Sequence, residues 1–268
     1  MAINIFTGGT SNWGTASNWS LGTVPTATDG HVTTFDASSP DCNQNVSGGV
    51  CNAIDFTNYT NTITMNNGIA VSGDITLGSG MTAVGASQLS INTSANITSN
   101  GYIWPLQFLF GGTSQTYTLQ DDFTVSGFVA TGNGNFINDN GTAKILYASG
   151  SYTAGAGGTF GTAKIILNGT GTLLSSVPTS SVLYNDFEIN TSGTITLGAN
   201  FRYSTGTFTY TTGTVVTTGN TFIIGTTDAT TTLSTDGIVW NNISILNRST
   251  TTLLSDITCS GAFFTQGT

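Results

Sequence analysis

The segment TYTLQDDFTVSG, residues 116–127, contains the pattern that decides the fold, and it recurs three more times along the chain. The other copies are TITMNNGIAVSG at 62–73, TITLGANFRYSTG at 194–206 and TTLLSDITCSG at 251–261. In each copy apolar residues mostly alternate with polar residues, which is typical of strands with one buried face. Each copy ends at a glycine, a residue that marks turns. The repeat therefore predicts short strands joined by tight turns.

A second recurring feature precedes every copy: a bulky residue followed by an alternating apolar pair. The bulky residues are Cys51, Trp104, Tyr184 and Trp240. Two features in a fixed order indicate true internal repetition, which has to be recognised before a fold is assigned. We expect the three aromatic members to pack in the core or at its corners. The two features together define modules at 51–103, 104–183, 184–239 and 240–268.

The spacing of the copies predicts the size of one coil. Successive copies lie 54, 78 and 57 residues apart. The longest interval contains its own duplication, Ala-Lys-Ile at 143–145 and again at 163–165, offset by 20 residues. Without those 20 residues the three intervals are nearly equal. We therefore predict coils of roughly 20 residues, three coils per module, and one additional coil in the second module.

Coils of this size predict an all-β fold, a parallel β-solenoid in which each coil stacks about 4.8 Å above the last. The 35 glycines and the scarcity of strong helix formers agree with it. A string of small β-sandwiches is the alternative, but one extra coil would disrupt a sandwich core. Residues 1–50 do not follow the repeat and are predicted to form an N-terminal cap or anchor before a solenoid domain at 51–268.

Charge excludes several classes of partner. The 268 residues have a net charge of −9, and only 6% are charged, whereas globular proteins average about 25%. The basic residues are Lys144, Lys164, Arg202 and Arg248. These are too few to bind nucleic acid or an anionic membrane surface. No apolar run approaches the roughly 18 residues of a membrane span. The start, Met1-Ala2-Ile3, has no basic or apolar leader region, so no secretory signal is predicted.

The stretch TSNWGTASNWSLGTVPTATDGHVTTFDA, residues 10–37, resembles the start of β-solenoid proteins of the bacterial surface adhesin type. With NYTNTITMNNGIAVSGDITL at 58–77, it also resembles tail-fibre-like or head-associated structural proteins of aquatic tailed bacteriophages. This resemblance implies a fibre, spike or capsid-decoration element on the virion surface. It implies other virion proteins as partners and a homo-oligomer, with a trimer favoured. A secreted bacterial adhesin or extracellular filament is the alternative.

Catalysis is weighed because solenoids also include polysaccharide-degrading enzymes. His31 is the only histidine, no G-x-S-x-G pattern occurs, and a solvated or capping role is expected for it. The carboxylate pairs are Asp121–Asp122 and Asp186–Glu188. The first falls at the turn of the repeat, and the second alternates with apolar residues and should point outward. No spacing for zinc or calcium ligands occurs. We therefore predict no enzyme, no catalytic residue, no cofactor and no metal site.

Binding of a host-surface glycan is the predicted activity. Exposed aromatic rings bind sugars by stacking, and Trp13 and Trp19 lie outside the repeat, so they are the expected glycan contacts. Cys42 and Cys51 flank a short polar loop and are a candidate disulfide pair after release into an oxidising medium. Cys259 occupies an apolar position of the repeat, which predicts a buried thiol.

Overall fold

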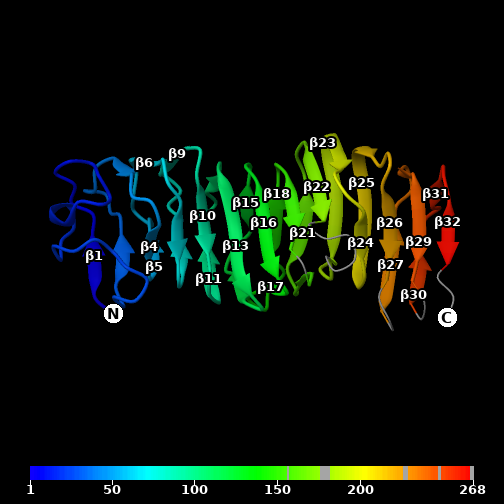
Figure 1. The fold of residues 1–268 in the computed structure, drawn as a ribbon, viewed down its shortest axis with the longest axis horizontal. Coiled ribbons are helices and arrows are strands. Elements are labelled where there is room, and N and C mark those ends of the chain that lie inside the picture. Colours follow the sequence, from blue (N-terminus) through cyan, green and yellow to red (C-terminus); the bar gives the residue numbers. More distant parts are fainter. Residues whose placement is uncertain (156, 176–181, 226–228, 247–248, 266–268) are drawn as a thin grey trace.

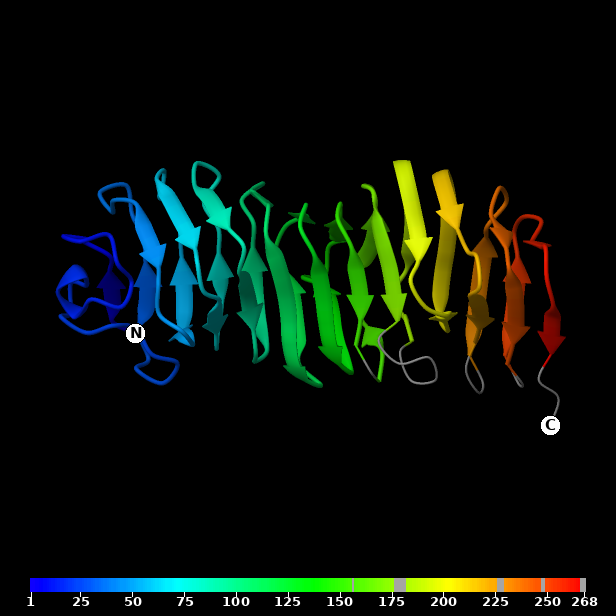
Figure 2. The same ribbon diagram turned by 45° about the horizontal axis from the view of Figure 1, so that its top comes forward.

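The chain forms a single elongated rod of stacked parallel coils, with its N- and C-termini at opposite ends (Figures 1 and 2). This computed structural model describes residues 1–155, 157–175, 182–225, 229–246 and 249–265. It is 52% strand, and its coils of about 21 residues make about ten turns. The predicted all-β solenoid class is confirmed, and the coil length agrees closely with the prediction. No helix among the described residues has the length and apolar character needed to cross a membrane.

The coils pass through their strands in a constant order, so the rod has three faces. Face 1 holds the first strand of each coil, except between β20 and β24, where Leu183 alone bridges Thr159 and Tyr203. Its strands are β1 (Ile3–Ile5), β2 (Val32–Thr34), β5 (Ala53–Asp55), β8 (Ile75–Thr76), β11 (Ala95–Thr98), β14 (Thr116–Leu119), β17 (Asn135–Asp139), β20 (Thr159–Phe160), β24 (Phe201–Tyr203), β26 (Thr221–Ile224), β29 (Asn242–Ile245) and β32 (Phe263–Thr265).

Face 2 holds the second strand of each coil. Its strands are β3 (Cys42–Gln44), β6 (Thr62–Met65), β9 (Thr82–Gly85), β12 (Ile103–Trp104), β15 (Phe123–Val125), β18 (Ile145–Ala148), β21 (Lys164–Leu167), the first parts of β23 (Phe187–Leu197) and β25 (Gly206–Val216), β27 (Thr230–Ser234) and β30 (Thr250–Leu253).

Face 3 completes each coil. Its strands are β4 (Gly49–Cys51), β7 (Ile69–Val71), β10 (Gln88–Ile91), β13 (Gln107–Thr113), β16 (Val129–Asn133), β19 (Tyr152–Ala154), β22 (Gly171–Ser175), the last parts of β23 and β25, β28 (Val239–Trp240) and β31 (Thr258–Cys259). β23 and β25 are long because each turns the corner from face 2 to face 3 without a break.

Alternation of side chains builds one continuous core along the rod. On face 1, Ile54 pairs with Ile75, and Ile75 pairs with Ile97 in the next coil. All three are buried, while their strand neighbours point outward. Because the coils are parallel and in register, equivalent residues stack directly above one another, and the core becomes a column of such rows.

The four sequence repeats do not lie on the same face, which corrects the predicted three coils per module. The copy at 62–73 runs from face 2 to face 3, whereas the copy at 116–127 runs from face 1 to face 2. The copy at 194–206 runs from face 3 to face 1, and the copy at 251–261 again from face 2 to face 3. Each copy thus begins one face earlier than the copy before it. The repeated unit is a strand–corner–strand segment, and every corner of the rod accepts it.

The two Ala-Lys-Ile segments of the second module, 143–145 and 163–165, do not pair residue for residue in the structure. Lys164 pairs with Ile145, and Ile165 pairs with Leu146, so the register offset is one residue shorter than the sequence offset. A one-residue shift reverses which side chains face the core. Accordingly Ile165 is buried, while Ile145 of the matching tripeptide is only half-buried on the outer side.

Glycines end the repeats because neighbouring coils approach closely at the corners. A Cβ atom on Gly127 would lie 2.2 Å from the Leu106 carbonyl oxygen, and one on Gly261 would lie 2.3 Å from that of Asn241. Real Cβ atoms do not tolerate such distances, so only glycine fits there. Gly206 has a φ of +95°, a conformation that side-chain-bearing residues rarely adopt.

The solenoid begins before residue 51. β2, β3 and β4 pair in parallel with β5, β6 and β7 of the following coil, so they already form a regular coil. The predicted boundary of the N-terminal segment is therefore too late. The segment that differs from the coils is the loop between β1 and β2, which includes the 3-10 helix η1 (Ala16–Asn18). This loop closes the N-terminal end of the core.

Candidate functional site

Trp13 and Trp19, the predicted glycan contacts, are buried in the N-terminal loop. Their side chains are 0% and 2% exposed, and the two rings meet edge to face with centroids 5.0 Å apart. Phe6 and Phe35 complete the cluster at 5.1–5.9 Å from one or both tryptophans. Because their ring faces are covered, neither tryptophan is a surface for a sugar. The prediction that they are exposed is wrong: they cover the first coil.

Asn18 holds the loop in place through its side-chain amide. Its Oδ1 accepts hydrogen bonds from the backbone N–H groups of Gly9 and Thr10 at 2.9 and 3.2 Å. Its Nδ2 donates to the Asn12 carbonyl at 2.7 Å and to the Thr10 hydroxyl at 2.9 Å. The amide is buried, and both its oxygen and its nitrogen make two hydrogen bonds. These bonds take the place of the backbone pairing that a neighbouring coil would supply. No sequence signal distinguished Asn18 from the many other asparagines.

Cys42 and Cys51 are free thiols, so the predicted disulfide is not present. They lie on β3 and β4, and both side chains point into the core. Burial raises the pKa of Cys51 to about 12 and also raises the pKa of Cys42. Cys259, predicted to be buried, is half-exposed because it lies in the last described coil.

The acidic candidates at the turns have structural roles, as expected for Asp121–Asp122. Asp121 accepts hydrogen bonds from the backbone N–H groups of Ser99 and Asn100 at 2.7 and 2.6 Å. Asp122 accepts one from Ile145 at 3.0 Å. The pair thus connects the coil before it to the coil after it. His31 lies beside Asp29 in the N-terminal loop, with Nδ1 3.8 Å from the Asp29 carboxylate.

Glu188 points outward, as predicted, because Phe187 and Ile189 on either side of it enter the core. Neighbouring side chains nevertheless leave it only 8% exposed. Its carboxylate accepts from Lys164 Nζ at 2.5 Å and from the Thr211 hydroxyl at 2.7 Å. Burial favours the neutral acid, but hydrogen bonds from Lys164 and Thr211 outweigh it, so the pKa of Glu188 lies below its usual value. Asp186 is exposed and accepts from the backbone N–H of Thr207 at 2.8 Å. The two carboxylates therefore serve separate contacts.

The aromatic residues before the repeats divide into two groups. Trp104 and Trp240 are buried, as predicted, and Trp240 stacks on Phe222 with centroids 4.1 Å apart. Tyr184 is instead half-buried on the outside of face 1, where it stacks on Phe160 at 4.2 Å, and Phe160 stacks on Phe136 at 5.2 Å. These three rings cover one another's faces along the rod axis, so they reinforce the stacking of three coils.

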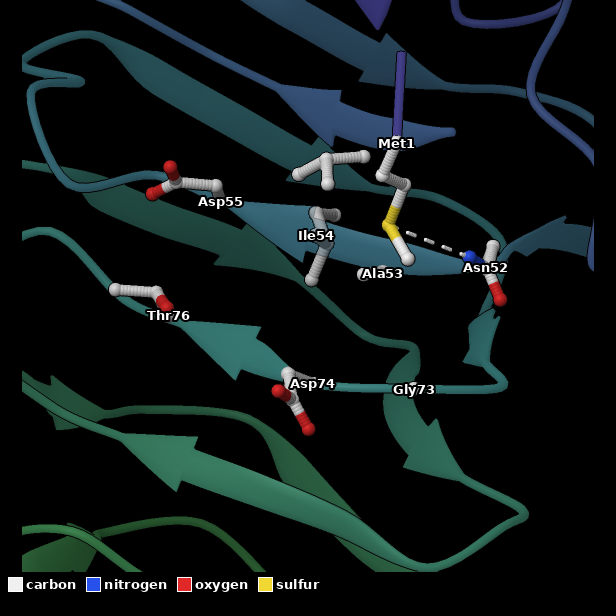
Figure 3. A pocket seen from close by; sticks show the side chains of 9 residues that line it. Met1, Asn52, Ala53, Ile54, Asp55, Gly73, Asp74 and Thr76 are labelled. Carbon is white, nitrogen blue, oxygen red and sulfur yellow. Dashed lines mark hydrogen bonds between the residues drawn. The ribbon is translucent and has the colours of Figure 1, made fainter. Parts of the chain in front are cut away.

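A shallow groove of about 360 Å³ lies on face 1, near the N-terminal end (Figure 3). Its apolar lining includes Val32, Ala53 and the exposed Met1, and its polar lining includes Asn52 and Asp74. Asn52 Nδ2 lies 3.9 Å from the Met1 sulfur, a weak contact. Asp74 accepts from the backbone N–H of Asn96 at 2.8 Å. An amide and a carboxylate beside an apolar floor suit the hydroxyls and C–H groups of a sugar.

Among the residues that the structure describes, no strand pairs with the outer side of the last coil. β30, β31 and β32 each pair with only one neighbour, on the side of the preceding coil. Leu254 is 65% exposed and Phe263 is 53% exposed, and Leu253 and Phe264 are exposed to a similar degree. Within the described ranges, no group of three or more His, Cys, Asp or Glu side chains is placed to hold a metal ion.

Comparison with protein-family models, with curated proteins and with solved structures finds no match to this chain, so the fold and the surfaces described above carry the functional argument.

Proposed function

We propose that this protein is a rigid structural rod displayed on the surface of a tailed-phage virion, as a fibre, spike or capsid-decoration element that contributes to attachment to the host. The observation that carries the proposal is the unbroken parallel pairing of coils around one core, from β2 to β32. A rod of this kind holds its two ends at a constant separation. That is the mechanical requirement of a display element.

The packing of the rod supports a mechanical role. Each coil between the first and the last forms backbone hydrogen bonds with the coils on both sides, and stacked rings and aliphatic rows fill the space between them. A solenoid is stabilised by such nearest-neighbour interfaces, so load along its length is shared by many contacts. The virion setting itself rests on the resemblance of residues 10–37 and 58–77.

Host attachment is assigned to the groove of face 1, because Trp13 and Trp19 are buried. Asn52→Ala should weaken binding to host-surface glycan, measured on immobilised polysaccharide, at least several-fold without changing stability. Asn242→Ala, on the same face near the other end, is the matched control. Equal binding by the two variants would remove the groove from the proposal and leave the structural role intact.

The setting is tested by electron microscopy of a phage lysate with gold-labelled antibodies against the purified protein. The proposal expects gold on the particles. Gold on uninfected cells instead would overturn it and favour the alternative, a secreted bacterial adhesin or extracellular filament.

The non-enzymatic part of the proposal has its own test. Incubation of the protein with host polysaccharide should leave the polymer length unchanged. New reducing ends or unsaturated products would instead identify a polysaccharide-degrading enzyme.

A further inference from the structure

Several asparagines of the chain are followed directly by glycine. They are Asn67, Asn100, Asn133, Asn140 and Asn168. Asparagine is a thermolabile residue, and a following glycine favours its spontaneous deamidation, because glycine has no side chain to hinder attack by its own backbone nitrogen. The dipeptide is the same at every site, so the sequence alone does not rank the sites. The hydrogen bonds of the structure separate them.

The reaction requires a side-chain amide that can move. The backbone nitrogen of the glycine loses its proton to solvent and bonds to the Cγ carbon of the asparagine. The Cγ–Nδ2 bond then breaks, and the amide nitrogen takes up a proton and leaves as ammonia. Water opens the resulting succinimide ring at either carbonyl, which gives aspartate or isoaspartate. A hydrogen bond that holds the amide or the glycine N–H has to break first, so it slows ring closure.

Asn100 is held on both sides of the bond that would form. Its Nδ2 donates to the Leu77 carbonyl at 2.7 Å. The N–H of Gly101, which would supply the attacking nitrogen, donates to Ser99 Oγ at 3.1 Å. Both reacting groups are therefore occupied in the folded rod, and ring closure would break two hydrogen bonds.

Asn140 and Asn168 are each held by a hydrogen bond to the preceding coil. Asn140 Nδ2 donates to the Gln120 carbonyl at 3.2 Å. Asn140 Oδ1 also accepts from the Thr142 hydroxyl at 2.6 Å. Asn168 Oδ1 accepts from the Ser149 hydroxyl at 2.6 Å. These bonds restrict the Cγ carbon that the glycine nitrogen has to reach.

Asn133 and Asn67 differ from the other three, because no hydrogen bond holds their side chains within the part of the chain that the structure describes. Asn67 is half-buried at the corner between β6 and β7. Asn133 is exposed at the end of β16, near the middle of the rod (Figure 1). An amide that is both exposed and unheld meets the requirements of the reaction best.

We propose that Asn133 is a site of spontaneous deamidation and that this reaction limits the lifetime of the rod. Asn135, two residues further on, is buried and joins its coil to the preceding one. Its Nδ2 donates to the carbonyls of Phe110 and Gly111 at 2.9 and 2.7 Å, and its Oδ1 accepts from the N–H of Gln115 at 2.9 Å. Isoaspartate at position 133 adds one carbon atom to the backbone just before this residue, so it should displace these bonds.

Peptide mass spectrometry of the full chain, incubated at mildly alkaline pH, measures the reaction at each site as a mass gain of about 1 Da. In the folded chain Asn133 should react at least about tenfold faster than Asn140, whose amide is held. The same chain unfolded in urea is the matched control, because there the sites lose their hydrogen bonds and should react at similar rates. Equal rates in the folded chain, or faster reaction at Asn140, would overturn the proposal.

The effect on the rod is measured separately with two variants. Asn133→Ser removes the reactive amide, and Asn140→Ser is the matched change at a held site. After the same incubation, the urea midpoints of the wild type and of Asn140→Ser should fall below those of their fresh samples, whereas that of Asn133→Ser should stay constant. Equal losses in both variants would show that deamidation of Asn133 does not limit the lifetime of the rod.

Discussion

The first and last described coils of the rod differ in how far they are covered. At the N-terminal end, four aromatic rings and the buried amide of Asn18 cover the first coil, and the loop 6–31 supplies the hydrogen bonds that a neighbouring coil would have made. At the C-terminal end, the last described coil keeps three strands paired on one side only and exposes Leu254 and Phe263. Among the described residues, a loop covers the first coil, and no strand pairs with the outer side of the last coil.

This difference shows what a coil requires from its neighbours. A coil of about 21 residues has too little apolar volume to hold itself together, so its stability comes from the interface above and the interface below. The N-terminal coil has both interfaces, because the loop acts as the second one. The last coil has a single interface, so we expect it to be the least stable part of the described rod.

The largest expected difference between the ends is in thiol reactivity. Iodoacetamide should modify Cys259 at least about a thousand-fold faster than Cys42 or Cys51, because the buried pair reacts only after an opening that costs several kcal/mol. The raised pKa of Cys51, about 12, reduces its thiolate fraction further. Peptide mass spectrometry of time points measures the three rates, and Cys259→Ser should abolish the fast phase. Similar rates, or a disulfide between Cys42 and Cys51, would contradict the structure.

The aromatic cluster should give the next largest effect. Phe35→Ala removes a ring that packs on Trp13, Trp19 and Phe56, and should lower the free energy of unfolding by about 3–5 kcal/mol. Phe264→Ala at the open end should change it by less than about 0.5 kcal/mol, because its side chain is already exposed. Urea unfolding of both variants tests the contrast, and comparable losses would mean that the ends do not differ as described.

The amide of Asn18 should contribute less than the rings but more than its counterpart near the open end. Asn18→Ala leaves the N–H groups of Gly9 and Thr10 without their acceptor, which should cost about 1–3 kcal/mol. Asn242→Ala removes an exposed acceptor for the N–H of Ala262 and should cost less than about 1 kcal/mol. The urea midpoints of the two variants measure the difference. The reverse order would show that Asn18 does not organise the loop.

The smallest expected effect on the free energy of unfolding comes from Glu188, whose contact with Lys164 lies away from both ends of the rod. The pKa of Glu188 is below its unfolded value, so its stabilisation is present above the unfolded pKa and is lost as pH falls through the folded pKa. Wild-type stability should therefore decrease relative to Glu188→Gln as the pH falls below about 4. Urea midpoints measured between neutral and acidic pH provide the test. Parallel pH profiles would show that the contact with Lys164 has no net effect.

The sequence predicted the fold more accurately than the roles of single residues. Period-two alternation and the recurring glycines identify stacked strands, because both features follow from local geometry that each coil repeats. The prediction of three coils per module failed because the repeated unit is a strand–corner–strand segment, and the sequence does not say which corner it occupies. The exposure assigned to Trp13 and Trp19 failed because residues outside a repeat can still pack on its end.

By itself the sequence determined the solenoid class, the approximate coil length, the presence of a distinct N-terminal segment and the turn role of Asp121 and Asp122. Only the tertiary structure decided which side chains share a face, and therefore that Glu188 is buried against Lys164 and that Trp13 and Trp19 cover the first coil. The physical reason is that alternation specifies inside and outside within a strand, whereas the register between coils specifies which residues become neighbours.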